Sequence, residues 1–206
     1  MLVLLVCGVL AFASAKYLTA KLLNMKSAPN QSEGFDFNYI VNSANMETGP
    51  RIGERIDLEN LKGPDGNSLA ETIDRPALIV AVNRGCGMCR TSADEMNEIQ
   101  RRLKPAGVQY YTVSFGTSPT PAEFFKFADS LNRGAPAFLR SMNEGNPPKQ
   151  LTAMLVPTHF LIDRNGVIIS KWPGSSNVEL VRHRMANQIV SDTLATLSAR
   201  SSHEPH

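Results

Sequence analysis

The sequence predicts an α/β protein with a mixed central β-sheet flanked by helices. In the first half, an apolar run at residues 77–83 precedes a helical pattern and a strand-like run at 108–115, which is typical of a parallel β-α-β unit. In the second half, two strand-like runs around a short turn indicate an antiparallel hairpin, followed by a long helical pattern. Strand pairs of both kinds in one chain predict a mixed sheet.

The composition is that of a globular protein and excludes several classes of function. The chain has 206 residues, enough for one domain with extensions, and 42% of them are hydrophobic. With 21 basic against 19 acidic residues, the net charge of +2 is too balanced to indicate nucleic acid or an acidic substrate as a partner. Three cysteines are too few for a secreted mini-domain held by disulfides.

A hydrophobic leader opens the chain, and residues 1–26 are predicted to be a signal peptide or a membrane anchor. The apolar run before Lys16 is nearer in length to the core of a signal peptide than to the roughly 20 residues of a spanning helix. Small residues before Lys16 fit a cleavage site after Ala15. The lysines follow this run, which by the positive-inside rule would leave the next segment in the cytoplasm. We expect export, with cleavage and anchoring both open.

The remainder divides into three parts. Residues 27–49 hold many turn formers and no sustained period, so we expect a linker or irregular arm. A folded domain is expected at 50–198, and residues 199–206 are expected to be a disordered tail. Near the start of the domain, Asp65-Gly66 predicts a turn between two short extended runs.

The first half of the domain predicts two strands and two helices. The run at 77–83 has the character of a strand buried on both faces. From Cys86 onward, apolar residues recur at helical spacing until Pro105 to Gly107 end the pattern. The helix after the second strand should have Thr120 as N-cap, Pro121 at its first position, Glu123 in a capping box and Gly134 beyond its end. Residues 135–153 are expected to be a loop with little regular structure.

The second half predicts a hairpin and a final helix. Residues 158–162 and 167–172 have strand character, and Asp163 to Gly166 should form the turn between them. Ser176 and Glu179 could form a capping box at the start of the last helix. Its apolar face is expected to comprise Val178, Val181, Met185, Ile189, Leu194 and Leu197.

Cys86 and Cys89 are the candidate catalytic residues. Cys86 falls where a strand gives way to a helix, and free N–H groups and the dipole at a helix N-terminus lower the pKa of a thiol. Cys89 lies one helical turn further on, so that its sulfur can close a disulfide with Cys86. Such a pair can attack a partner disulfide and then resolve the mixed disulfide. Arg84 and Arg90 would favour the thiolate further if they lie close.

The two cysteines could also serve in a metal site, in a non-catalytic module or in a peroxidase. Structural zinc requires four ligands, and the chain has no second CxxC pair. Copper binding would need a third ligand, and His159 is the histidine nearest to a motif. Two structural cysteines in a non-catalytic binding module are a further alternative. A peroxidase of the peroxiredoxin type is disfavoured, because Asn83 and Ile79 stand where its motif before Cys86 has threonine and proline.

A second motif supports the redox interpretation. The segment MLVPTHFLIDRNGVI at residues 154–168 resembles the part of thioredoxin-like proteins in which a cis-proline precedes a strand and a D-x-x-G turn. Together with the CxxC pair and the run IGERIDLENLKGPDGNSL, it resembles the TlpA/ResA branch of thioredoxin-like proteins over residues 50–195. The resemblance implies a thioredoxin-like fold. It also implies that Pro157 packs against the CxxC pair and that Val156 presents backbone groups to the substrate.

Three positions depart from the pattern of that family. Gly85 stands where tryptophan usually precedes the first cysteine, and Met88 where proline commonly precedes the second. Val80 stands where thioredoxins carry a buried aspartate. The motif therefore places no carboxylate to accept the proton of Cys89. The residues between the cysteines tune the reduction potential, so the direction of electron flow stays open.

The expected function is thiol–disulfide exchange with exported protein clients, in the reducing rather than the oxidising direction. The partners would be disulfide-bearing or dithiol proteins and an upstream electron donor, with a possible membrane tether and without nucleic acid. The resemblance implies a protein that is periplasmic, or anchored and facing the periplasm. No cofactor and no metal are expected, because the two sulfurs carry the electrons.

Overall fold

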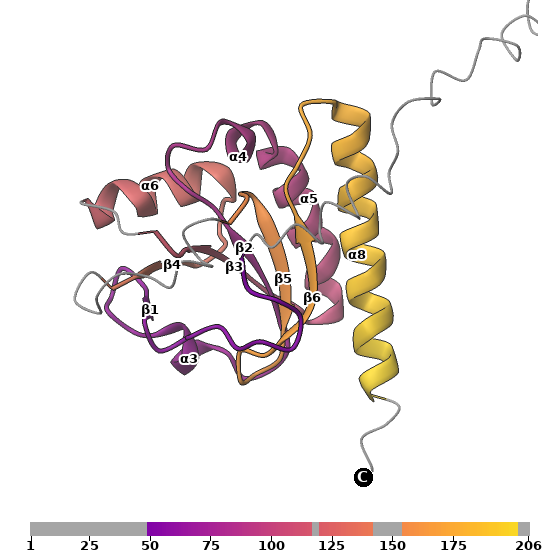
Figure 1. Cartoon of the computed structure of the whole chain (residues 1–206), viewed down its shortest axis with the longest axis horizontal. Helices are drawn as coiled ribbons and strands as arrows, with labels where there is room; N and C mark the ends of the chain where they lie inside the picture. Colours follow the sequence, from indigo (N-terminus) through magenta and orange to yellow (C-terminus); the bar gives the residue numbers. More distant parts are fainter. Residues whose placement is uncertain (1–48, 117–119, 142–153, 202–206) are drawn as a thin grey trace, which may run out of the picture. The chain divides into compact units, whose positions relative to one another are not determined.

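Six strands form one mixed sheet in the order β1-β4-β3-β2-β5-β6 (Figure 1). The computed structural model describes residues 49–116, 120–141 and 154–201, so the predicted leader lies outside the described residues. β2 and β4 pair with β3 in parallel, whereas the β1–β4, β2–β5 and β5–β6 pairs are antiparallel. The predicted mixed sheet is confirmed, with strands β1 Leu61–Lys62, β2 Ala77–Ala81, β3 Gln109–Ser114, β4 Ala137–Arg140, β5 Thr158–Ile162 and β6 Ile168–Pro173.

Helices cover both faces of this sheet. α5 and α8 lie side by side along one face in Figure 1, and α6 contributes to the same hydrophobic core. The opposite core is closed by α3 and by the segment that precedes β1. The helices are α3 Leu69–Thr72, α4 Gly87–Thr91, α5 Ala93–Leu103, the 3-10 turn η1 Lys104–Ala106, α6 Pro121–Leu131 and α8 Glu179–Ser201.

β2 is the strand on which the site is built, and both of its faces are buried. Leu78, Val80 and Val82 point into the core under α5 and α8, whereas Ile79 and Ala81 point into the opposite core. This alternation follows from the two-residue period of a strand. The sequence prediction of a strand buried on both faces is confirmed.

The predicted loop at 135–153 is wrong in its first part, because β4 occupies Ala137–Arg140. Only four residues long, this strand carries no periodicity that a sequence pattern could detect. Its conformation depends on pairing with β3 on one side and β1 on the other. Residues 142–153 of the same prediction lie outside the described residues.

The two predicted helices in the first half of the domain are confirmed with adjustments. The helix after Cys86 is divided into α4 and α5 at Ser92, and Gly107 ends it in the left-handed conformation with φ of 71°. Thr120 is the N-cap of α6 and Pro121 its first residue, as expected. The capping box is incomplete, because the Thr120 hydroxyl donates to the side chain of Glu123 and does not cap the backbone.

The predicted face of the last helix is partly wrong. Val178 and Leu194 are exposed, at 47% and 37%. The residues of α8 that are buried against the sheet and α5 are Val181, Ala186, Ile189, Val190 and Thr193. α8 begins at Glu179 and continues to Ser201, beyond the expected domain boundary at 198.

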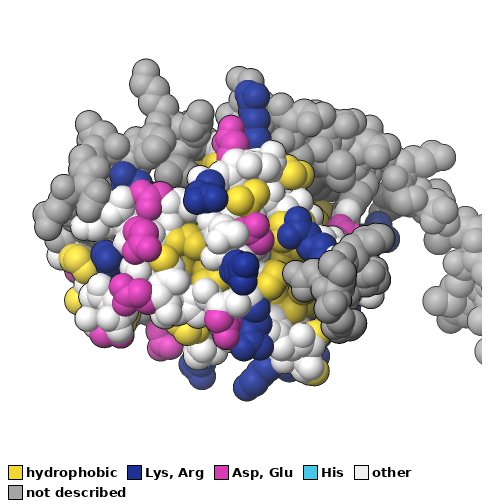
Figure 2. Space-filling model, turned by 90° about the horizontal axis from the view of Figure 1, so that it is seen from below, with side chains coloured by type: hydrophobic (Ala, Val, Ile, Leu, Met, Phe, Trp, Pro, Cys, Tyr) yellow, Lys and Arg dark blue, Asp and Glu magenta, His cyan; other side chains and the backbone are white. Residues whose placement is uncertain are grey.

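The surface agrees with the balanced composition. On the face drawn in Figure 2, which is the lower side of Figure 1, Lys and Arg side chains lie among Asp and Glu side chains. Within the described ranges, no helix combines the length and apolarity needed to cross a membrane.

Candidate functional site

Cys86 is held at the junction between β2 and α4. The loop after β2 is closed by two bonds to Asn83: the Cys86 N–H donates to its carbonyl at 2.9 Å, and the Gly85 N–H donates to its side chain at 3.2 Å. Cys86 then serves as the N-cap of α4, and its Sγ accepts a hydrogen bond from the Cys89 N–H at 3.0 Å. A backbone N–H aimed at sulfur stabilises a thiolate there.

Cys86 and Cys89 form a disulfide, with their Cα atoms 5.3 Å apart. The two sulfurs differ in access to solvent. Cys89 is fully buried in the core, whereas Cys86 is partly exposed. A bulky partner can therefore reach only Cys86, as expected of the attacking cysteine in a CxxC pair.

Val156 lies directly against Cys86, and Pro157 is the next residue in the chain. The Val156–Pro157 peptide bond is cis, and Pro157 immediately precedes β5. The carbonyl oxygen of Val156 lies 3.3 Å from Cys86 Sγ. The structure therefore brings together four predicted site residues that are about 70 residues apart in sequence.

The two arginines that were expected to favour the Cys86 thiolate, Arg84 and Arg90, make their contacts with other groups. The Arg84 guanidinium pairs with Glu123 and bonds the Thr120 hydroxyl at 3.3 Å. Arg90 donates to the Arg84 carbonyl at 3.2 Å and lies over the Phe127 ring, 5.2 Å from its centroid. These contacts organise the loop around the site, and the effect of either arginine on Cys86 stays a prediction.

His159, the histidine of the copper alternative, is buried on β5. Its Nε2 lies 3.2 Å from the Tyr110 hydroxyl, which belongs to β3. Burial lowers the pKa of His159 to about 3, because the charged form is poorly solvated there. Burial also raises the pKa of Tyr110. The described residues contain no group of three His, Cys, Asp or Glu side chains that could hold a metal ion.

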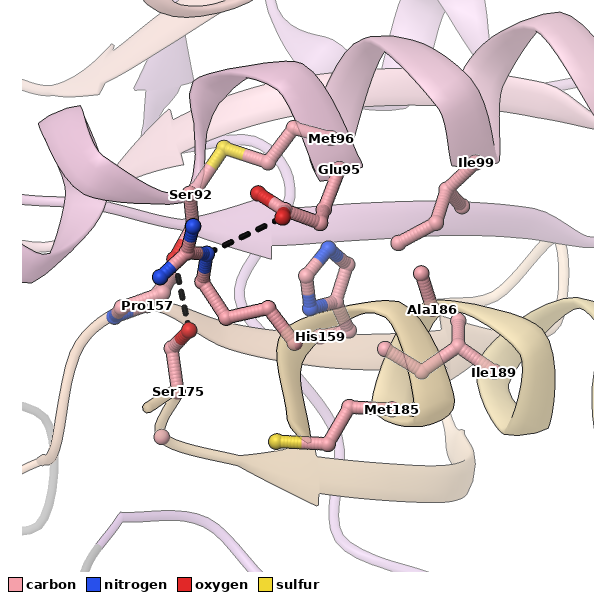
Figure 3. Close-up of a pocket in the computed structure, with 12 residues that line it drawn as sticks. Ser92, Glu95, Met96, Ile99, Pro157, His159, Ser175, Met185, Ala186 and Ile189 are labelled. Carbon is pink, nitrogen blue, oxygen red and sulfur yellow. Dashed lines mark hydrogen bonds and ion pairs between the residues drawn. The ribbon is translucent and has the colours of Figure 1, made fainter. Parts of the chain in front are cut away.

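A small cavity of about 20 Å³ lies behind Pro157, between α5, β5 and α8 (Figure 3). Two polar contacts close its rim. The hydroxyls of Ser92 and Ser175 are 2.5 Å apart, and the Arg182 Nε donates to Glu95 Oε1 at 3.0 Å. Sequence patterns could not pair Glu95 with Arg182, because 87 residues separate them.

No family model matches the chain, and no curated protein matches it. Solved structures do match. One is a structure described as a putative thiol:disulfide interchange protein DsbE from Chlorobium tepidum. It matches with a TM-score of 0.52 at 23% identity, and the match covers 68% of this chain and 96% of that one. The thioredoxin domain of a thiol-disulfide oxidoreductase from Bacteroides vulgatus gives 0.54 at 18% identity, over 70% of this chain and 99% of that one. The chain has a thioredoxin fold.

A protein with a different chemistry has a similar fold. A bacterioferritin comigratory protein from Xanthomonas campestris, described for its alkyl peroxide reduction activity, matches with a TM-score of 0.50 at 13% identity. That match covers 71% of this chain and 99% of the other. The thioredoxin fold by itself therefore does not select between disulfide exchange and peroxide reduction. The residues around Cys86 have to make that distinction.

Proposed function

We propose that this protein is a thiol–disulfide oxidoreductase that exchanges disulfides with protein clients through Cys86 and Cys89. The observation that carries the proposal is the difference in solvent access between the two cysteine sulfurs. Cys86 caps α4, is accessible and lies 3.3 Å from the Val156 carbonyl, whereas Cys89 is buried within bonding distance behind it. This arrangement suits attack by one sulfur and resolution by the other.

In the reducing direction, the Cys86 thiolate attacks one sulfur of a client disulfide. A bond forms between Cys86 and the client, and the other client sulfur leaves as a thiolate and takes up a proton. Cys89 then loses its proton and attacks Cys86 Sγ. The Cys86–Cys89 disulfide forms, the bond to the client breaks, and two electrons have passed to the client. An upstream dithiol protein restores the reduced pair, so that no cofactor is needed.

Recognition of the client would use the backbone beside Pro157. An extended client segment can donate an N–H to the Val156 carbonyl, which places its sulfur close to Cys86. Gly85 leaves room beside Cys86, since an added Cβ would meet only the Asn83 side chain, at 4.0 Å. A client with a bulky residue next to its cysteine would therefore be accepted.

Capture of a mixed disulfide tests this function. In a Cys89→Ser variant the resolving sulfur is absent, so client proteins should accumulate as adducts on Cys86. The adducts should be released by a reductant and visible by non-reducing electrophoresis and mass spectrometry. A matched Cys86→Ser variant, which keeps the buried Cys89, should capture nothing. Equal capture by both variants, or by neither, would contradict the mechanism.

We further propose that the protein is exported and acts as a reductase in the periplasm, through the leader at residues 1–26. A reporter enzyme that is active only after export, fused to the C-terminus, should be active with the full chain. The same fusion lacking residues 1–15 should be inactive. An active reporter without the leader would contradict export by this segment.

A further inference from the structure

The loop that carries Cys86 has little stiffness of its own. Gly85 and Gly87 flank Cys86, and an added Cβ at Gly87 would meet nothing within 4 Å. Glycine restricts the backbone less than any other residue. The Cys86 thiolate is nevertheless stabilised only while Sγ stays near the Cys89 N–H, which lies 3.0 Å away. The geometry of Cys86 therefore depends on contacts that hold the loop from outside.

Helix α6 is a fixed support beside this loop. Its inner side is buried in the hydrophobic core through Phe124, Phe127, Ala128 and Leu131. Its first turn contacts Arg84, which lies two residues before Cys86. The Arg84 guanidinium forms an ion pair with Glu123 and donates to the Thr120 hydroxyl at 3.3 Å. The side chain of Arg84 thus joins the loop to the N-terminal turn of α6.

Arg90 holds the same loop residue from a second helix. It belongs to α4 and follows Cys89 directly. Its Nη2 donates to the Arg84 carbonyl at 3.2 Å, and its guanidinium lies over the Phe127 ring, 5.2 Å from the centroid. Arg84 is therefore held by α6 through its side chain and by α4 through its carbonyl.

The stability of α6 does not explain these contacts. Thr120 and Glu123 have the spacing of a capping box, in which both side chains would bond the backbone of the helix. Thr120 instead makes no capping bond with its side chain, and its hydroxyl donates to Glu123. The ion pair that replaces the cap is exposed, at 51% for Arg84 and 56% for Glu123, and such pairs stabilise a fold little. Both α6 residues are thus arranged for the loop rather than for their own helix.

We propose that Arg84 is a positioning residue for Cys86, and that its ion pair with Glu123 keeps Cys86 Sγ on the Cys89 N–H. The inference deepens the proposed exchange reaction, since it concerns how the attacking thiolate is maintained. The ion pair takes no part in bond breaking or proton transfer. It acts by holding the loop, so that a larger fraction of Cys86 is thiolate at a given pH in the reduced protein.

Charge and position predict opposite effects for the removal of Glu123. If Arg84 acted on Cys86 through its charge alone, removing the carboxylate would leave that positive charge uncompensated and increase the thiolate fraction. If the ion pair positions the loop, the same change releases the loop and decreases the thiolate fraction. Glu123→Ala therefore distinguishes the two effects by the sign of the result.

Alkylation of the reduced full chain with iodoacetamide measures the thiolate, because only the thiolate reacts. The reagent is uncharged, and peptide mass spectrometry identifies modification of Cys86. In Glu123→Ala the midpoint of the pH dependence should rise, and below that midpoint the rate should fall at least about threefold. The limiting rate at high pH should stay unchanged, because access to the sulfur is not altered.

Two further variants test whether Glu123 acts through Arg84. Arg84→Gln should lower the rate at least as much as Glu123→Ala. The double variant Arg84→Gln/Glu123→Ala should be no slower than Arg84→Gln alone, since the two residues act as one unit. The exposed Glu98–Arg101 pair on α5 is the matched control, and Glu98→Ala should leave the rate of Cys86 unchanged.

An unchanged or faster rate in Glu123→Ala would overturn the inference. An unchanged rate in Arg84→Gln, multiplied losses in the double variant, or an equal loss in Glu98→Ala would overturn it as well. Alkylation needs no client, so it tests the positioning of Cys86 separately from the exchange reaction. Absence of client capture by Cys89→Ser would instead contradict the proposed exchange reaction itself.

Discussion

At the scale of single residues, His159 couples the stability of the domain to pH. Its pKa is about 3 in the folded protein and about 6.5 when exposed, so the unfolded state binds a proton that the folded state does not. The stabilisation from neutral His159 is therefore complete above about pH 6.5 and is lost as the pH falls from about 6.5 to about 3.

We predict that the free energy of unfolding falls by about 2 kcal/mol more between pH 7 and pH 5 in the unaltered protein than in His159→Leu. The reason is that the leucine variant has no imidazole to protonate in the unfolded state. Urea denaturation of both proteins at the two pH values measures this difference. Equal pH dependence in both proteins would show that His159 is not held neutral by burial.

At the scale of elements, α5 and α8 are joined by a buried ion pair. The side chains of Glu95 and Arg182 are 7% and 12% exposed, and 3.0 Å separates their charged atoms. Removing one member leaves an uncompensated charge, which typically costs about 3–5 kcal/mol. Replacing both with apolar residues avoids that cost.

We therefore expect Arg182→Met to lower the free energy of unfolding by about 3 kcal/mol and Glu95→Leu/Arg182→Met to recover most of the loss. The exposed Glu98–Arg101 pair on α5 is the matched control, and Arg101→Met should cost at most about 1 kcal/mol. Denaturant unfolding of the three variants gives these values. Equal losses in the single and double variants would show that packing, not charge, joins the two helices.

The turn between β5 and β6 depends on Gly166, which has φ of 79°. An added Cβ would lie 2.6 Å from the Ile56 carbonyl oxygen, and the Ile56 N–H donates to the Gly166 carbonyl. Gly66 has a similar φ of 84°, but an added Cβ there would meet nothing within 4 Å. An alanine at Gly66 would therefore meet backbone strain alone, whereas an alanine at Gly166 would meet backbone strain and steric overlap.

We predict that Gly66→Ala costs about 1–2 kcal/mol from the left-handed conformation alone. Gly166→Ala should cost at least about 1 kcal/mol more, because the turn must also move away from Ile56. Thermal or urea unfolding of the two variants measures the difference. Equal costs would mean that the segment around Ile56 yields freely to the added methyl group.

At the scale of the whole molecule, the reduction potential is linked to global stability. If the protein acts as a reductase, its disulfide form must be favoured by the fold over its dithiol form. We predict that the oxidised protein unfolds at a higher denaturant concentration than the reduced protein. Equilibration with glutathione provides a check, since about 30 mV corresponds to about 1.4 kcal/mol for two electrons. A reduced form that is the more stable one would contradict the reducing direction.

Much of the architecture could be predicted from the sequence because its signals are local. The apolar run of β2, the helical spacing after Cys86 and the turn at Asp163 to Gly166 each lie within a short window. The sequence does not predict β4, because the extended conformation of its four residues depends on pairing with the strands on either side. The sequence predicts the buried face of α8 only in part, because sequence spacing does not show where a long helix leaves the core.

The sequence by itself determined the fold class and the pair of sulfurs, since a strand, a CxxC and a helix follow one another without interruption. It also identified Val156 and Pro157, although only folding brings them to Cys86. Tertiary structure alone decided which cysteine is accessible, where Arg84 and Arg90 point, and that His159 and Glu95 face one cavity. The physical reason is that burial and pairing depend on residues distant in the chain, whereas secondary structure and helix capping depend on neighbours.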